Sequence, residues 1–183
     1  MSQDEPVRRT TLPNGLNVAY QVKSELRQFY EDIFERRLYL QGGITLPPAA
    51  CVFDAGANIG LFTLFVAQSC PGARIFAFEP APPLLPILAA NAALAVGCEV
   101  VVCPYGLAAR AGTASLTFYP HSSGLSSFYP DAAAEATALR RLIGNQLARG
   151  GRPDLELLRG YEDELVRERL RGETWSCPLR TLS

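Results

Sequence analysis

The sequence of 183 residues lacks several features that would assign it to a specialised class of protein. No apolar run approaches the roughly 20 residues that a membrane-spanning helix needs. The first residues, MSQDEPVRRTT, are polar throughout, so we expect no secretory signal. With 17 basic and 18 acidic residues, the net charge of −1 offers no basic surface for nucleic acid. We therefore expect a cytoplasmic protein that binds neither a membrane nor nucleic acid.

Residues that commonly bind metals are also scarce. The five cysteines show neither a CxxC pair nor a cluster with histidine: Cys51, Cys70, Cys98, Cys103 and Cys177. We predict free thiols, a reducing compartment and no metal site. The single histidine, His121, follows Tyr119-Pro120 in a loop. It is a candidate general base, and a solvated polar residue is the alternative.

The spacing of apolar residues predicts an α/β domain. We expect a strand at 51–53, a helix at 59–68, a strand at 74–78, a helix at 84–94 and a strand at 99–103. This order is the amino-terminal half of a doubly wound, Rossmann-like parallel sheet. The apolar run at 51–53 predicts a buried strand.

A different pattern precedes this core. Residues 1–23 form a polar lead, in which Pro13-Asn14-Gly15 is a turn that can join two short strands. Apolar residues at three- and four-residue spacing then predict a leading helix over 24–37, with Ser24 as its N-cap.

The region after the core predicts an insertion. Residues 106–119 contain two short runs separated by Gly112, which suggests a hairpin. Helical spacing follows at 139–147 and again from Leu155 and Leu158 to Leu170, and a final strand is expected at 175–182.

One glycine turn carries most of the functional information. Residues Val52 to Gly60 read VFDAGANIG, a strand end followed by an acid and a turn into a helix. A helix that begins there directs unpaired N–H groups into the crevice above the sheet, and glycines let a ligand approach the backbone. A tight turn without any binding role has the same pattern, so the turn alone leaves both interpretations open.

Glu79 favours the binding interpretation. It lies at the end of the next expected strand, in the run IFAFEP. A carboxylate there can accept hydrogen bonds from both hydroxyls of a ribose. An ordinary exposed acid is the alternative, but the spacing from Asp54 and the preceding apolar run favour a nucleoside site.

The nucleoside is not expected to be a dinucleotide. Counted from Gly56, the third and sixth places of GxGxxG hold Asn58 and Leu61 instead of glycine. Asp54 would also set a negative charge beside two phosphates. S-adenosyl-L-methionine brings an ammonium, a sulfonium and one carboxylate, which suit an acid followed by a helix start. The sequence therefore predicts this methyl donor, and an NAD-dependent oxidoreductase is the less favoured alternative.

These residues resemble the FkbM-type methyltransferases, a family of S-adenosylmethionine-dependent enzymes that often O-methylate hydroxyls in natural-product and sugar biosynthesis. The resemblance runs from about Tyr20 to the end of the chain. The segments that carry it are FYEDIFERRLYLQGGITL (29–46), VFDAGANIGLFTLF (52–65), FAFEPAPP (76–83), NAALAVG from Asn91 and GLAARAGTASLTFYP (106–120).

The resemblance implies a class I methyltransferase fold and a set of cofactor-binding residues. Those expected around the methionine moiety are Asp54, Gly56, Asn58 and Gly60, while Glu79 is expected to hold the ribose. The helix that contains Tyr30 is expected to cover the pocket, with Tyr105 and Gly106 near the adenine.

The sequence departs from the family at its end. Family members continue past a strand like CPLRTLS into a strand with an acidic KIDVEG-type motif, and no residue here matches that acid. We therefore expect residues 24–183 to be the amino-terminal part of a methyltransferase domain. The expected acceptor is a hydroxyl of a small or carrier-protein-bound polyketide, peptide or sugar intermediate. A non-catalytic fragment or interaction module that keeps only the cofactor-binding half is the alternative.

Overall fold

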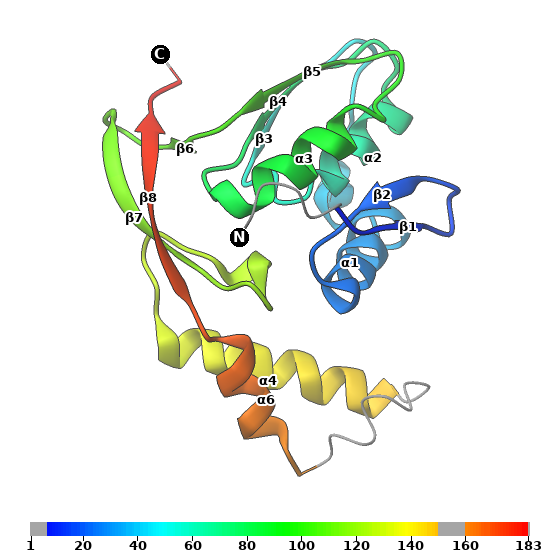
Figure 1. Cartoon of the computed structure of the whole chain (residues 1–183). Helices are drawn as coiled ribbons and strands as arrows, with labels where there is room; N and C mark the ends of the chain where they lie inside the picture. Colours follow the sequence, from blue (N-terminus) through cyan, green and yellow to red (C-terminus); the bar gives the residue numbers. More distant parts are fainter. Residues whose placement is uncertain (1–6, 150–159, 183) are drawn as a thin grey trace. The chain divides into compact units, whose positions relative to one another are not determined.

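The computed structural model describes residues 7–149 and 160–182 (Figure 1). These residues form two compact units. Unit 1 comprises the described residues of Met1–Ala114 and Ser176–Ser183, and unit 2 comprises those of Ser115–Trp175. Across the described ranges, no helix combines the length and the apolar character that crossing a membrane requires.

The centre of unit 1 is a three-stranded parallel sheet. Its strands are β3 (Cys51–Ala55), β4 (Arg74–Phe78) and β5 (Glu99–Cys103), in that spatial order. Each strand pairs with the next one along the chain, and both connections are helical crossovers. The predicted Rossmann-like α/β fold, with its β-α-β-α-β order, is confirmed.

The crossover helices α2 (Leu61–Ser69) and α3 (Leu85–Ala92) contact each other and lie beside the sheet (Figure 1). Right-handed crossovers that advance in one direction place both helices on the same face. The buried Leu88 of α3 packs with Ala57 and Ala77, next to half-buried valines of β5. Burying one leucine in this way contributes about 2 kcal/mol, so α3 is held firmly behind the carboxyl end of the sheet.

The expectation that the first core strand is buried is wrong. Cys51 and Phe53 of β3 are exposed, Phe53 to 54%, while Asp54 is buried. Successive side chains of a strand point to opposite faces, and β3 is an edge strand. Phe53 therefore lies on the face away from α3, stacked on Phe76 with ring centroids 5.4 Å apart. The apolar run predicts the strand, but it does not predict where the strand lies in the sheet.

The polar lead contains a hairpin. Strands β1 (Arg9–Thr11) and β2 (Asn17–Ala19) pair antiparallel around the predicted Pro13-Asn14-Gly15 turn. The leading helix begins one residue earlier than expected, as α1 (Lys23–Tyr30), and Val22 is its N-cap. Ser24 lies inside the helix, so its predicted capping role is wrong.

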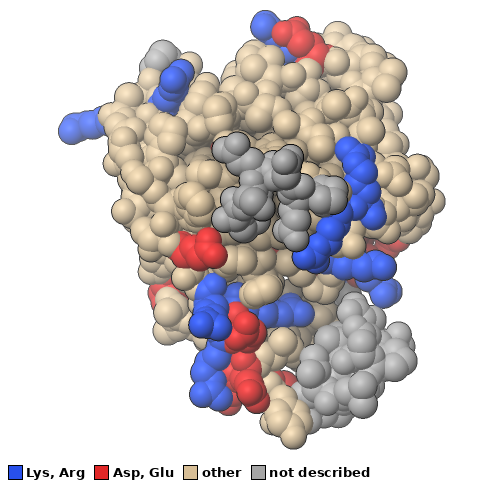
Figure 2. Space-filling view, in the orientation of Figure 1, with Lys and Arg blue, Asp and Glu red and all other residues tan. Residues whose placement is uncertain are grey.

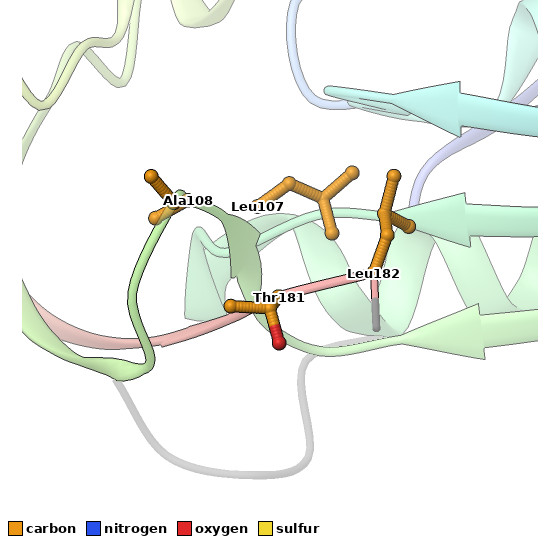
Figure 3. A pocket seen from close by; sticks show the side chains of 5 residues that line it. Leu107, Ala108, Thr181 and Leu182 are labelled. Atoms are coloured by element: carbon orange, nitrogen blue, oxygen red, sulfur yellow. The ribbon is translucent and has the colours of Figure 1, made fainter.

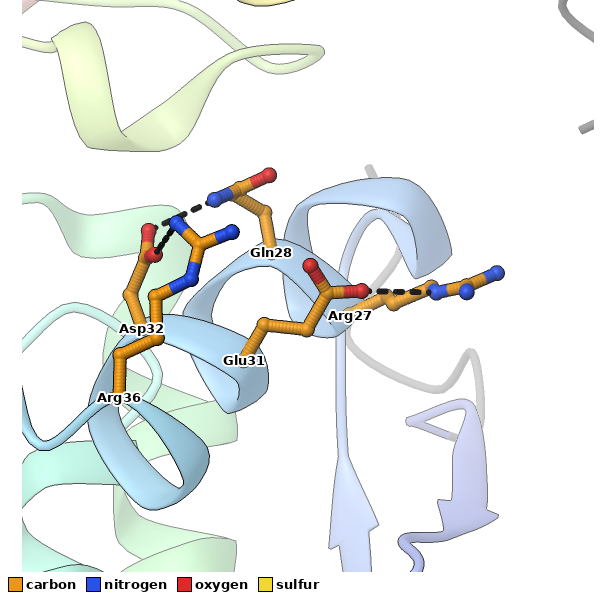
Figure 4. A network of polar contacts seen from close by, with 5 residues as sticks. All are labelled: Arg27, Gln28, Glu31, Asp32 and Arg36. Carbon is orange, nitrogen blue, oxygen red and sulfur yellow. Dashed lines mark hydrogen bonds and ion pairs between the residues drawn. The ribbon is translucent and has the colours of Figure 1, made fainter. Parts of the chain in front are cut away.

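The leading helix continues as one turn of π-helix, η1 (Glu31–Glu35), and is followed by the 3-10 segment η2 (Leu38–Gly43). Figure 4 shows the polar contacts along its outer side. Arg27 Nε lies 3.1 Å from Glu31 Oε1, and Asp32 accepts hydrogen bonds from Gln28 Nε2 at 2.7 Å and Arg36 Nη1 at 3.0 Å. Such exposed pairs four residues apart each add a few tenths of a kcal/mol, about 0.2–0.5.

A second sheet contains β6 (Gly106–Leu107), β8 (Glu173–Arg180) and β7 (Gly112–Phe118), in that order. The hairpin predicted over 106–119 does not form, because β8 lies between β6 and β7. The alternating run that ends at Phe118 does mark a strand, but its partner comes from the distant segment that forms β8. The final strand expected at 175–182 is confirmed as β8.

Unit 2 contains the helices α4 (Ala132–Arg149) and α6 (Glu162–Arg169). They pack through a buried cluster of Leu139, Ile143 and Val166. Leu155 and Leu158, which began the second predicted helix, lie outside the described residues. Figure 2 shows acidic and basic side chains side by side in the lower part of the view, where Figure 1 labels α4 and α6.

Candidate functional site

Asp54 is the first buried acid of unit 1, at the carboxyl end of β3. Its side chain is only 7% exposed. The Thr63 hydroxyl donates a hydrogen bond to Asp54 Oδ2 at 2.6 Å, and the Thr63 N–H donates a second. Burial raises the pKa of Asp54, and these two bonds offset part of that rise. The start of α2 therefore positions this carboxylate.

The glycine turn after β3 is bonded directly to the end of β4. The Gly56 and Ala57 N–H groups both donate to the Phe78 carbonyl at 2.9 Å. The next amide, that of Asn58, donates to Glu79 Oε2 at 2.8 Å. Three successive amides of the turn are thus held by two successive residues of the neighbouring strand end.

The two glycines of the turn have different surroundings. Both have left-handed backbones, with φ of +80° at Gly56 and +82° at Gly60. A Cβ at Gly60 would lie 2.8 Å from Leu88 Cδ1, so this glycine lets the turn pack on α3. A Cβ at Gly56 would meet nothing within 4 Å, so this glycine leaves space where a ligand can approach the backbone.

Glu79 is the second buried acid, 6% exposed, so the interpretation of it as an ordinary exposed residue is wrong. Its two oxygens accept hydrogen bonds at 2.8 Å from the N–H groups of Asn58 and Ala81. Burial raises the pKa of Glu79, and the negative charge of Asp54 raises it further. Cys177 of β8 is fully buried nearby, and its pKa is raised by burial and then by the charge of Glu79.

The charge balance of this site is unusual for a protein interior. The donors bonded to Asp54 and Glu79 are a hydroxyl and backbone amides, all of them neutral. The ion pairs of the described residues include neither acid. Two buried carboxylates that raise each other's energy are costly unless a positive charge joins them. The arrangement therefore suits a ligand that carries positive charge.

Tyr105 and Gly106, predicted at the adenine, follow β5 directly. The ring of Tyr105 lies edge-on to Phe78, with centroids 5.7 Å apart, and 4.7 Å from the Arg180 guanidinium. These contacts place Tyr105 against the end of β4 and beside β8. An open hollow of about 590 Å³ adjoins this position and is lined by Leu107, Ala108, Ala109, Thr181 and Leu182 (Figure 3). Only the threonine hydroxyl adds a polar side-chain atom to that lining.

Within the part of the chain that the structure describes, no hydrogen bond, ion pair or ring contact joins Tyr30 or His121 to the acidic pair. Tyr30 is buried and stacks on Phe34 at 5.1 Å, and Phe34 in turn meets Phe65 of α2 edge-on. His121 lies in unit 2 and is exposed. The covering role of Tyr30 and the catalytic role of His121 stay predictions.

Two buried polar side chains beside the turn were missed by the sequence reasoning. Thr63 and Asn91 are both fully buried, and both bond to the segment between Asp54 and Gly60. A signal was present, because each is a polar residue inside an otherwise apolar helix. Such a residue needs a buried hydrogen-bond partner, although the sequence does not say which.

Several known proteins are similar to this chain. It is 39% identical over 181 residues to the AMB antimetabolite synthetase AmbE of Pseudomonas aeruginosa, a match of 98% of the chain and 8% of that protein. It is 43% identical over 137 residues to the 31-O-demethyl-FK506 methyltransferase FkbM of Streptomyces tacrolimicus, covering 74% of the chain and 52% of that protein. Methyltransferase sdnD of Sordaria araneosa is 39% identical over 112 residues, which are 60% of the chain and 42% of that protein.

The chain thus spans about half the length of the curated methyltransferases that it matches, and a small part of the synthetase. No protein-family model matches the chain.

Proposed function

The chain belongs to the FkbM-type methyltransferase family, and on this premise we propose that it binds S-adenosyl-L-methionine for methyl transfer to a hydroxyl. The observation that carries the proposal is the pair of buried carboxylates, Asp54 and Glu79, whose hydrogen-bond donors among the described residues are all neutral groups around one glycine turn. A ligand with an ammonium and a sulfonium offsets that negative charge, whereas a pyrophosphate would add to it.

Each part of the turn has a role in this proposal. Asp54 attracts the cationic end of the methionine moiety, and the open backbone at Gly56 lets that moiety approach. Gly60, the N-cap of α2, makes no side-chain cap bond, and the Thr63 N–H is bonded to Asp54, so the N–H groups of Leu61 and Phe62 are suited to a carboxylate. Glu79 retains lone pairs beyond its two backbone bonds, and these accept hydrogen bonds from ribose hydroxyls.

The catalytic contribution of these residues is positioning. When bound, the cofactor supplies an electrophilic methyl group. The residues of the turn hold the cofactor in one orientation, so that an acceptor oxygen can meet the methyl in line. Fixing two reactants in this geometry supplies a large share of many rate enhancements, on the order of 7–11 kcal/mol at best. His121 stays the candidate base for an acceptor hydroxyl that is not already acidic.

The acceptor class rests on the relatives. One relative is a 31-O-demethyl-FK506 methyltransferase, and another is an antimetabolite synthetase. We infer that the acceptor is a hydroxyl of a polyketide, peptide or sugar intermediate, either free or attached to a carrier protein.

Isothermal titration with S-adenosyl-L-homocysteine tests the cofactor assignment. We expect Glu79→Ala to weaken binding at least about 30-fold, since charge-assisted hydrogen bonds are worth about 1.5–3 kcal/mol each. Glu99→Gln is the matched control, because Glu99 is an exposed acid in the adjacent strand. Undiminished binding by the Glu79 variant would contradict the ribose assignment, and tighter binding of NAD would favour the oxidoreductase alternative.

Methyl transfer distinguishes an enzyme from a cofactor-binding module. We expect methylation of at least one acceptor in a panel of hydroxyl compounds incubated with S-adenosyl-L-methionine. Binding of the cofactor without any transfer would favour the alternative of a non-catalytic module.

A further inference from the structure

We propose that Asn91 is a positioning residue that holds the cofactor-binding turn by bonding it to the β1–β2 hairpin. The inference rests on the function proposed above. Asn91 lies on α3, is 0% exposed and makes three hydrogen bonds. Its Oδ1 accepts from the Ala19 N–H at 2.7 Å, and its Nδ2 donates to the carbonyls of Ala19 at 2.9 Å and Ile59 at 2.6 Å.

The hairpin side of this contact explains why the residue is an asparagine. Val18 and Ala19 of β2 are both fully buried, so their backbone groups need partners inside the protein. A carboxamide offers a donor and an acceptor side by side, and Asn91 uses both on the two backbone groups of Ala19. It therefore pairs with β2 as a neighbouring strand would. The hairpin is bonded to α3 and, through this one side chain, to the turn.

The second donor of Asn91 acts on the turn itself. The Ile59 carbonyl lies between Asn58 and Gly60, both of which have left-handed backbones. Gly60 packs on Leu88, one helical turn before Asn91 on α3. The bond to Ile59 and the packing at Gly60 thus fix the turn from the side of α3, while Phe78 and Glu79 fix it from the side of β4.

A purely structural asparagine would affect every ligand equally. Destabilising the whole unit lowers the fraction of binding-competent protein, which reduces the apparent affinity for all ligands by the same factor. Displacing the turn around Ile59 instead affects the part of the ligand that the turn contacts. In the proposed function that part is the methionine moiety, whereas the ribose is held by Glu79.

The experiment compares two ligands on the full chain. S-adenosyl-L-homocysteine has the amino-acid part, and 5′-methylthioadenosine has the ribose and adenine without it. We expect Asn91→Leu to weaken S-adenosyl-L-homocysteine at least about tenfold and 5′-methylthioadenosine less than about threefold, measured by titration calorimetry. Leu139→Ala in unit 2 is the control, since it removes buried apolar volume far from this bond network in the sequence and should leave the ratio of the two affinities unchanged.

A measurement without ligand makes the test independent of the proposed function. The Asn58 amide bonds to the Glu79 carboxylate, and the Gly60 amide bonds to the Ala57 carbonyl. We expect Asn91→Leu to accelerate hydrogen exchange at these two amides by at least about tenfold more than at amides of β5. If Asn91→Leu does not fold, Asn91→Ser is measured in its place. Serine is smaller and polar, and its side chain is too short to make the bonds of the carboxamide.

The outcomes distinguish the positioning role of Asn91 from the proposed binding of S-adenosyl-L-methionine. Equal losses for both ligands, or uniform changes in exchange, overturn the positioning role and leave Asn91 as a general stabilising residue. Failure of the unaltered chain to bind S-adenosyl-L-homocysteine overturns the proposed function, while the exchange experiment still decides whether Asn91 fixes the turn.

Discussion

Among the described residues, the two units of the molecule bury different polar groups: unit 1 buries two carboxylates, whereas the buried polar side chains of unit 2 are the hydroxyls of Ser122 and Ser123. Unit 1 buries Asp54, Glu79 and Asn91 beside its apolar core. The cluster that joins α4 and α6 in unit 2 is apolar, and the ion pair between Arg140 and Asp163 is exposed. Packing two helices together needs only an apolar cluster of this kind. Buried acids such as those of unit 1 are expected where a protein gives up stability for a binding site.

The direction of the pKa shifts supports this difference. Asp54 and Glu79 have pKa values raised above their ordinary 3.8 and 4.5. The folded state therefore holds these protons more tightly than the unfolded state does. This contribution is fully favourable below the ordinary values and is lost as the pH rises through the raised values. Once ionised, the two carboxylates oppose folding, and a cationic ligand would relieve that opposition.

The largest expected effect tests unit 2. Leu139→Ala leaves a cavity in the cluster with Ile143 and Val166, and should lower the free energy of unfolding by about 2–5 kcal/mol. Chemical denaturation monitored by circular dichroism measures it. Affinity for S-adenosyl-L-homocysteine should not change at a temperature where the variant is folded. A loss of affinity under those conditions would contradict the division of roles between the units.

The next prediction concerns unit 1, where a substitution should weaken ligand binding without lowering stability. Asp54→Asn should weaken S-adenosyl-L-homocysteine about 30-fold, the equivalent of about 2 kcal/mol, because it removes the charge that meets the ligand's ammonium. The melting temperature at neutral pH should stay the same or rise, because a buried charge is removed. Thermal denaturation and calorimetry on one preparation measure both. A stability loss equal to that of Leu139→Ala would mean that Asp54 is mainly structural.

A smaller effect is expected from pH alone. Cation binding favours the ionised carboxylates, so the protein must release any protons held by Asp54 and Glu79. Affinity for S-adenosyl-L-homocysteine should fall about tenfold as the pH is lowered through the raised pKa values of these carboxyls. Calorimetry in buffers of different ionisation enthalpy would detect the released protons. Asp54→Asn should flatten the profile, and an unaltered profile would assign the protons to another group.

The smallest effect concerns the surface of unit 2. Arg140 Nε lies 2.9 Å from Asp163 Oδ1, and both side chains are more than half exposed. Arg140→Ala should change the free energy of unfolding by less than about 1 kcal/mol and leave ligand affinity unchanged. The same denaturation and binding measurements apply. A larger loss would show that unit 2 also relies on its polar contacts.

Local patterns in the sequence predict the central fold well. The predicted strands at 74–78 and 99–103 match β4 and β5, because short apolar runs between turn residues leave few other arrangements. Pairing over long distances is not encoded locally. The exposure of Phe53 depends on which face of the sheet α3 covers, and the separation of β6 from β7 depends on β8, which is far along the chain.

The site is partly predictable for the same reason. Asp54, the turn and Glu79 follow from residue type and position at strand ends. The bonds from the turn to the Phe78 carbonyl, and the bond from the Ala81 N–H to the Glu79 carboxylate, leave no trace in residue type. Thr63 and Asn91 are visible as polar residues in apolar helices, but their partners at Asp54 and Ile59 depend on the packing of α2 and α3 behind the sheet.

The bonds from the turn to Phe78 and Glu79 also bear on how a ligand arrives. Three successive amides of the turn are bonded to acceptors within the protein itself. The turn therefore loses little conformational entropy on binding, and most of the interaction energy is available for affinity. Association should follow a single encounter step without a slow rearrangement.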